Sequence, residues 1–184
     1  LMKIIKTKIK DLVILEPSVF EDKRGYFMES FKNSWFVENF PSINFIQENE
    51  SKSVRGVLRG LHFQNPPYDQ TKLVRVINGK VLDVVVDLRK SSSTYGMSFT
   101  FELSDLNKKQ LLVPKGFAHG FLVKSNTAIF SYKVDNIYSK NHENGIIWND
   151  KFLDIDWSFS EKNINISEKD KQLSNFHDFK NPFK

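Results

Sequence analysis

Residues 73–88 read LVRVINGKVLDVVVDL, and this stretch decides the class of fold. Apolar residues alternate with other residues on both sides of Asn78-Gly79, and a period of two is typical of β-strands. Asn-Gly is also the pair that most readily adopts the positive φ angles of a tight two-residue turn. The stretch therefore predicts a β-hairpin.

Other short strands are expected before and after this hairpin. The apolar patterns that predict them lie at residues 11–15, 26–31, 45–47, 54–64, 98–104, 110–113, 117–123 and 127–134. Helical patterns are confined to residues 34–40 and to a short stretch after Ser167. Many short strands joined by regular turns predict an all-β sandwich or barrel.

Length and composition narrow the class of protein. The 184 residues suit one domain spanning 1–184, and 17 Phe predict a large aromatic core. The absence of Cys excludes disulfides, zinc-thiolate sites and a cysteine nucleophile. A net charge of +5 favours an anionic ligand, but the basic residues are interspersed with acids, so no nucleic-acid partner is expected. No apolar run reaches the ~20 residues that span a bilayer, which predicts a cytoplasmic protein with no membrane partner.

Residues 55–64, RGVLRGLHFQ, place two glycines and a histidine within one predicted strand. Interior glycine weakens a strand and often marks a bulge or the close approach of a ligand. Arg59 and His62 have opposite parity, so a regular strand would direct them to opposite faces of its sheet. We predict a bulge near Gly60 that brings both side chains to one cavity. The segment alone leaves open that His62 is a structural histidine beside a surface arginine.

Residues 114–120, PKGFAHG, carry the spacing Pro-x-Gly-x-x-His, which is the second half of the cupin barrel signature. In metal-binding cupins the first half supplies His-x-His and a glutamate, because several ligands must converge on one ion. Only His62 stands near the corresponding place, so a metal site is not expected. His119 also fits a hydrogen-bonded core histidine.

Three further candidates each have an ordinary structural explanation. Tyr132 shares the apolar face of its strand with Phe130, so its hydroxyl needs a partner inside the fold. Lys72 opens the predicted hairpin, where a solvated lysine is common. Asp170 lies three residues after Ser167, the spacing of a capping box at a helix start. Residue type alone leaves their roles open.

Ordered blocks along nearly the whole chain resemble the dTDP-4-dehydrorhamnose 3,5-epimerase family, which acts on a dTDP-linked 4-keto sugar on the way to dTDP-rhamnose. The blocks are residues 20–31, 47–51, 56–62, 70–76, 113–121, 132–133, 148–150, 155–157 and 167–170. The resemblance implies a cupin-type β-barrel, or jelly roll, with a few short helices and no cofactor. It also implies a homodimer that binds a nucleotide sugar. Two departures are Glu48, where the family more often has Asp, and Trp157-Ser158 in place of Trp-Pro.

The same resemblance assigns roles to individual residues. His62 matches the catalytic base and Asp170 the carboxylate that pairs with it, whereas Lys72 matches the group beside the enolate and Tyr132 the acid on the opposite side. Contacts to the nucleotide, diphosphate and sugar are implied for Arg24, Glu29, Gln47, Asn49, Arg59, His119, Glu143 and Lys169.

These residue types suit inversion at a carbon next to a ketone. Imidazole, with a pKa of about 6.5, is a suitable base, an ammonium group stabilises the enolate oxygen, and a phenol can return a proton to the opposite face. The expected reaction inverts C3 and C5 of dTDP-4-dehydro-6-deoxy-glucose to give dTDP-4-dehydro-rhamnose. The alternatives are a C3-only or C5-only epimerase of a related nucleotide-linked 4-keto sugar, and a non-catalytic module that binds such a sugar.

Overall fold

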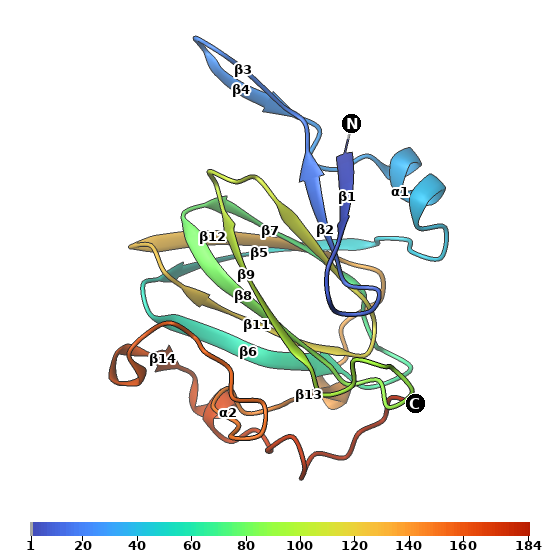
Figure 1. Cartoon of the computed structure of the whole chain (residues 1–184), viewed down its shortest axis with the longest axis vertical. Coiled ribbons are helices and arrows are strands. Elements are labelled where there is room, and N and C mark those ends of the chain that lie inside the picture. Colours follow the sequence, from blue (N-terminus) through green and yellow to red (C-terminus); the bar gives the residue numbers. More distant parts are fainter. Residues whose placement is uncertain (1) are drawn as a thin grey trace.

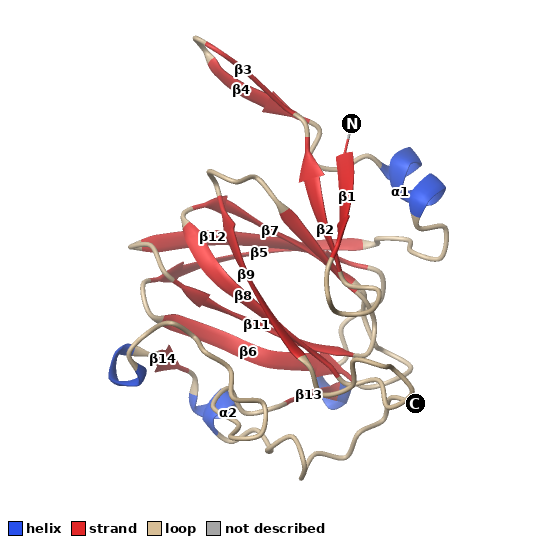
Figure 2. Cartoon of the chain, viewed as in Figure 1, coloured by secondary structure: helices blue, strands red, loops and turns tan. Residues whose placement is uncertain are grey.

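The computed structural model describes residues 2–184 and consists mainly of β-strands (Figures 1 and 2). The helices are α1 (Asn33–Asn39), α2 (Glu168–Lys171) and 3-10 turns at Lys140–His142 and Glu161–Asn163. The strands are β1 (Met2–Lys6), β2 (Val13–Pro17), β3 (Val19–Asp22), β4 (Gly25–Met28), β5 (Gln47–Val54), β6 (Val57–Gln64), β7 (Lys72–Asn78), β8 (Lys80–Asp87), β9 (Ser98–Ser104), β10 (Gln110–Val113), β11 (Phe117–Val123), β12 (Thr127–Val134), β13 (Glu143–Gly145) and β14 (Asn165–Ile166). The predicted all-β class is confirmed.

Two sheets face each other and enclose the main core. The first sheet has the order β1-β2-β10-β7-β12-β5, and the second has β13-β6-β11-β8-β9 with β14 beside β6. Both sheets are open at their edges, so the strands form a layered jelly roll whose hydrogen bonds do not close into one barrel. Buried residues from the two sheets meet between them, among them Val74, Val85, Phe121 and Phe130. This interior also holds the polar groups described below.

The predicted hairpin is wrong in its pairing, although both of its strands form. β7 pairs with β10 and β12 in the first sheet, whereas β8 pairs with β11 and β9 in the second. Gly79 has φ +83°, and a Cβ there would lie 2.2 Å from the Thr127 carbonyl oxygen. Its N–H donates to Asp105 Oδ2 at 2.9 Å. The Asn-Gly turn therefore carries the chain from one sheet to the other. β7 and β8 each pair with two other strands, so neither pairs with the other.

The predicted bulge in β6 is confirmed. In the pairing of β6 with β11, His62 stands opposite His119 and Arg59 opposite Phe121, so three steps along β6 match two along β11. Gly60, with φ +134°, sits inside this shift, and a Cβ there would lie 2.5 Å from Gly120 Cα. The extra residue reverses the parity of the strand and turns Arg59 and His62 toward the same cavity.

The C-terminal segment from Phe176 to Phe183 runs along the outer face of the second sheet (Figure 1). Phe179 and Phe183 are buried, and their rings lie 5.9 and 5.5 Å from the ring of Phe63 on β6. Because these rings anchor the C-terminal segment on β6, α2 is held beside the cavity end of that strand.

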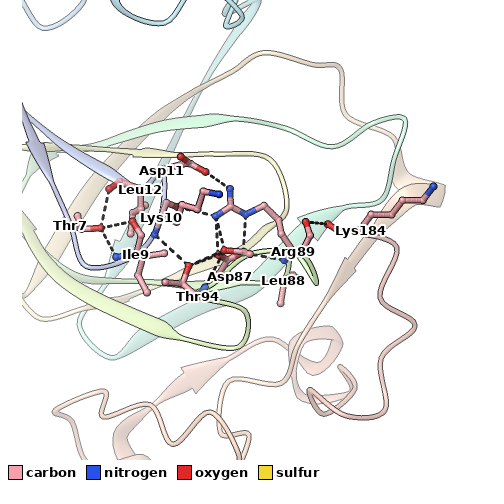
Figure 3. A network of polar contacts seen from close by, with 12 residues as sticks. Thr7, Ile9, Lys10, Asp11, Leu12, Asp87, Leu88, Arg89, Thr94 and Lys184 are labelled. Carbon is pink, nitrogen blue, oxygen red and sulfur yellow. Dashed lines mark hydrogen bonds and ion pairs between the residues drawn. The ribbon is translucent and has the colours of Figure 1, made fainter.

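A buried polar network ties the β1–β2 loop to the end of β8 (Figure 3). The Asp87 carboxylate, fully buried, accepts hydrogen bonds from Arg89, Ser92 and Thr94. Arg89 also donates to Asp11 at 2.7 Å. Both oxygens of the Asp87 carboxylate accept hydrogen bonds from nearby groups, so the network is structural.

Across residues 2–184, no helix has the length and apolar character needed to cross a membrane.

Candidate active site

A cavity of about 530 Å³ lies between the two sheets and receives side chains from both. Because β6 and β11 belong to one sheet and β5, β7 and β12 to the other, the groups surround the space from opposite sides. The segment 165–170 completes its wall. The residues that line it are Glu50, Ser51, Val57, Leu58, Arg59, His62, Lys72, His119, Gly120, Phe121, Phe130, Tyr132, Asn165, Ser167, Lys169 and Asp170.

His62 and Asp170 form a hydrogen-bonded pair at this cavity. His62 Nε2 lies 2.8 Å from Asp170 Oδ1, and the Gly60 N–H approaches Asp170 Oδ2 at 3.3 Å. Burial raises the pKa of Asp170, but the hydrogen bond and charge of His62, with the bonds from Gly60 and Ser167, hold the pKa below its usual value. An ionised carboxylate can only accept, so His62 Nε2 donates and Nδ1 is the nitrogen left to act as a base.

The backbone of Asp170 has a second use. Its N–H donates to Ser167 Oγ at 3.1 Å, so Ser167 caps α2 as the spacing of the two residues indicated. The cap and the carboxylate contact coexist, because the amide points along the helix while the side chain points to β6. Only half of the expected capping box forms, because the Asp170 carboxylate bonds to Gly60 and His62 and not back to the Ser167 N–H.

Lys72 brings a cation into the cavity from the first residue of β7. Burial lowers the pKa of Lys72 to about 8, against the opposing charges of Asp83 and Glu143. The amine is therefore mostly protonated at neutral pH. The preceding residue is fixed in place, since the Thr71 N–H donates to Asp135 Oδ1 at 2.7 Å.

Tyr132 enters the same cavity from β12, in the sheet facing His62. Beside it Phe130 stacks on Phe121 from the second sheet, with ring centroids 4.2 Å apart. Burial raises the pKa of Tyr132, while a hydrogen bond from Asn49 and the charge of Arg59 only partly oppose this. The phenol consequently keeps its proton at neutral pH and can act as a donor.

His119 and Arg59 line the cavity wall on the second sheet. His119 Nε2 lies 2.9 and 3.1 Å from the two oxygens of Asp83, a carboxylate that is fully buried. Arg59 Nε donates to Ser53 Oγ at 3.1 Å. Sequence reasoning missed Asp83, although an acid within the apolar run VLDVVVD of β8 was a usable signal.

Lys169 and Glu143 meet at the edge of the cavity. Lys169 Nζ lies 2.5 Å from Glu143 Oε2, and the Tyr138 hydroxyl donates to the same oxygen at 2.6 Å. Burial raises the pKa of Glu143, but these two partners bring it below its usual value. Lys169 lines the cavity, whereas Glu143 positions it from outside.

Besides Glu143, four of the expected binding residues lie outside this cavity within one chain. Arg24 sits on the hairpin of β3 and β4, which projects from the sheets (Figure 1), and pairs with Asp22 at 2.6 Å. Glu29 lies 3.7 Å from a neighbouring lysine, and the Gln47 amide donates to Asn49 Oδ1 at 2.8 Å on the edge strand β5. Asn49 is nevertheless the cross-strand partner of Tyr132.

Sequence reasoning also missed lining residues without distinctive chemistry, namely Ser51, Asn165 and Ser167. Polar residues of this kind are common on any surface, so no local signal singles them out. In residues 2–184 no three His, Asp or Glu side chains gather as a group that could hold a metal ion.

Comparisons with known proteins place the chain in a family. Residues 6–178 match the family model of dTDP-4-dehydrorhamnose 3,5-epimerase. The enzyme of that name from Shigella flexneri is 52% identical over 170 residues, which cover 89% of this chain and 94% of the relative. A dTDP-4-dehydrorhamnose 3,5-epimerase structure from Elizabethkingia anophelis has a TM-score of 0.92 at 50% identity and covers 98% of both chains. A dTDP-6-deoxy-D-glucose-3,5-epimerase from Legionella pneumophila in complex with dTDP-4-keto-L-rhamnose has a TM-score of 0.91 at 43% identity, covering 96% of this chain and 93% of that one. The chain belongs to the dTDP-4-dehydrorhamnose 3,5-epimerase family.

Proposed function

We propose that this isomerase inverts C3 and C5 of dTDP-4-dehydro-6-deoxy-glucose and releases dTDP-4-dehydro-rhamnose. One observation carries the proposal: His62 from the second sheet and Tyr132 from the first line the same cavity, with the Lys72 ammonium group between the two sheets. A base and an acid on opposite sides of one space are what inversion at a single carbon requires.

Each inversion proceeds through an enolate. Nδ1 of His62 removes the proton from the carbon beside the ketone, and the electron pair of that C–H bond moves onto the ketone oxygen. The Lys72 ammonium stabilises the resulting negative charge, and Asp170 stabilises the imidazolium. The Tyr132 hydroxyl then protonates the opposite face of the carbon. Solvent takes the proton from His62 and returns one to the phenolate before the second carbon reacts.

Two cationic side chains suit the diphosphate of the substrate. Arg59 and Lys169 both line the cavity, and guanidinium and ammonium groups form strong charge-assisted hydrogen bonds with phosphate oxygens. Arg59 lies across the bulge from His62 on β6, whereas Lys169 precedes Asp170 and pairs with Glu143 at the edge of the cavity. We propose that they hold the diphosphate while the sugar occupies the space between His62 and Tyr132.

We further propose that the protein works as a homodimer in which the β3–β4 hairpin packs on a second copy. The hairpin exposes Phe20, Tyr26 and Phe27 by 63, 53 and 66%. Clustered exposed aromatic side chains are typical of protein interfaces. The hairpin also carries Arg24, which does not line the cavity of its own chain, so the partner's cavity is its proposed place of action.

Incubation of dTDP-4-keto-6-deoxyglucose with the protein in heavy water tests the reaction. The expected product is dTDP-4-dehydro-rhamnose with deuterium at both C3 and C5 by NMR. Label at one carbon alone would establish the narrower epimerase instead, and unchanged, unlabelled sugar would refute the proposal.

Two histidine variants test whether His62 is the base. His62→Ala should lower turnover by about 10²–10⁴-fold, because it removes the base. The matched control is His177→Ala, since His177 is exposed, packs edge-on against Phe152 and lies outside the cavity. A His62→Ala protein as active as the control would exclude the assignment.

A further inference from the structure

Ser53 and Arg59 lie on either side of the corner where the chain passes from the first sheet to the second. Ser53 is in β5, at the edge of the first sheet, and Arg59 is in β6 of the second. The corner itself consists of Arg55 and Gly56. Gly56 has φ +82°, and a Cβ there would lie 2.4 Å from the Asn163 carbonyl oxygen. The backbone at the corner is therefore closely packed, which fixes how the two strands approach each other.

A hydrogen bond between the two side chains spans this corner. Arg59 Nε donates to Ser53 Oγ at 3.1 Å, and Ser53 is only 6% exposed. Within residues 2–184 neither side chain makes another hydrogen bond. A buried hydroxyl needs a partner, whereas an arginine beside a solvent-filled cavity does not. The bond therefore joins the two sheets at the cavity wall and holds the Arg59 side chain against it.

The end of the Arg59 guanidinium group remains available to a ligand. Its donors are on Nε and on both Nη atoms, and Ser53 takes only the Nε donor. Glu50 and Asp170 also line the cavity, but among the described residues neither forms an ion pair with Arg59, and Asp170 pairs with His62. Both Nη atoms can then bind two oxygens of one phosphate group in a bidentate arrangement.

Holding Arg59 in advance favours binding without any contact between Ser53 and the ligand. An unrestrained arginine has several rotatable bonds and loses conformational freedom when a ligand fixes it. Because Ser53 already holds Nε, part of that loss occurs on folding instead of on binding.

We propose that Ser53 is a positioning residue, which holds the Arg59 guanidinium group so that its Nη atoms bind the substrate diphosphate. It rests on the proposed function, since that function assigns the diphosphate to Arg59. It also explains why a buried polar residue stands next to Ala128, its partner across the sheet, which packs in the main core.

The Ser53→Ala substitution removes the acceptor of the Arg59 hydrogen bond. Its Kd for dTDP, measured by calorimetry, should rise by about three- to tenfold, the effect of releasing one long side chain. The KM for the 4-keto sugar nucleotide should rise by a similar factor. Because the lost binding is common to ground and transition states, kcat should stay within about twofold of the wild-type value. Ser53→Thr keeps a hydroxyl acceptor and should bind dTDP as the wild type does.

Ser104→Ala is the matched control. Ser104 is also a buried serine on a β-strand, and its Oγ accepts the Asn107 N–H at 3.1 Å. This variant should lower the melting temperature and leave the Kd for dTDP unchanged. It thereby shows what the loss of a buried hydroxyl does to the fold alone.

A double-mutant cycle tests whether Ser53 acts through Arg59. Arg59→Ala should weaken dTDP binding more than Ser53→Ala does, since it removes the proposed phosphate contact itself. In the Arg59→Ala background, Ser53→Ala should cause no further loss, because the group that it positions is gone.

A folded Ser53→Ala protein that binds dTDP as tightly as the wild type would overturn the proposal. An equal loss on Ser53→Ala with and without Arg59 would do so too, and the cycle can be run with Ser53→Val if the alanine variant is unstable. Failure of the proposed function looks different, since the wild-type protein would then leave the 4-keto sugar unchanged. In that case the dTDP titrations still decide whether Ser53 acts through Arg59.

Discussion

Lys72 carries the charge in the cavity that is most sensitive to pH. Burial lowers its pKa to about 8, and the proposed reaction needs its protonated form. As pH rises through this value the ammonium is lost, so kcat should fall above about pH 8. Tyr132 does not account for such a limb, because burial raises its pKa. A profile of kcat against pH in the wild-type protein measures this.

The Lys72→Arg substitution tests whether Lys72 causes the fall of kcat above about pH 8. A guanidinium keeps its charge far above this range, so the variant should have a lower kcat, because its geometry differs, but no loss of activity near pH 8. Persistence of the same alkaline limb in Lys72→Arg would show that another group titrates.

At the scale of residues, the catalytic roles could be predicted only from many sequence blocks considered together, and not from any single local pattern. His62 and Asp170 are 108 positions apart and meet at 2.8 Å, which no local pattern contains, and only the resemblance to a family paired them. The bulge at Gly60 did follow from residue parity. Asp83 was missed although an acid within an apolar strand is a usable signal, because its partner His119 lies on another strand, β11.

Among the elements, the close approach of β6 and β11 shapes the site. A Cβ on Gly120 would lie 2.6 Å from the Arg59 carbonyl oxygen and 3.0 Å from Gly60 Cα. Gly120→Ala should therefore push the strands apart, at a cost of about 1–3 kcal/mol in stability, and displace the Gly60 N–H that holds Asp170. Both the free energy of unfolding and kcat should fall.

Gly96→Ala separates the two effects. Its Cβ would crowd Phe176 at 3.3 Å, outside the cavity, and its φ of +75° adds backbone strain. This variant should lose stability while kcat of the folded protein is kept. If Gly120→Ala also kept its kcat, the bulge would have no part in placing the catalytic groups.

Strands were more predictable than their partners. The elements at 98–104, 110–113, 117–123 and 127–134 form at the predicted residues, because alternation is a local property. The pairing of β7 with β8 was wrong because partners depend on packing between distant segments. The continuous burial of Val84–Asp87 is typical of an interior strand, which favours neighbours on both sides.

For the whole molecule, the projecting hairpin leads to a test of the homodimer. If Arg24 acts in the partner's cavity, Arg24→Ala and His62→Ala proteins should each be weak alone. When mixed and allowed to exchange subunits, they should recover activity, because one site per mixed dimer then has both groups. Recovery is measured by the rate of product formation in the mixture.

No gain on mixing, with subunit exchange shown independently, would contradict action across the interface. A monomer by sedimentation would contradict the homodimer itself.

We also propose that residues 1–184 act as one domain, with Leu1 outside the described residues. The support is that Phe179 and Phe183 near the end of the chain pack on β6 beside the cavity.

The central claim is that His62 and Tyr132 serve opposite faces of one bound sugar, and Tyr132→Phe in heavy water tests it most directly. Without the phenol, His62 can still remove a proton, receive deuterium from solvent and return it to the same face. The account predicts recovered starting sugar that carries deuterium beside the ketone, with inversion slowed by orders of magnitude. Inversion at the wild-type rate in Tyr132→Phe, or recovered sugar without any deuterium, would contradict it.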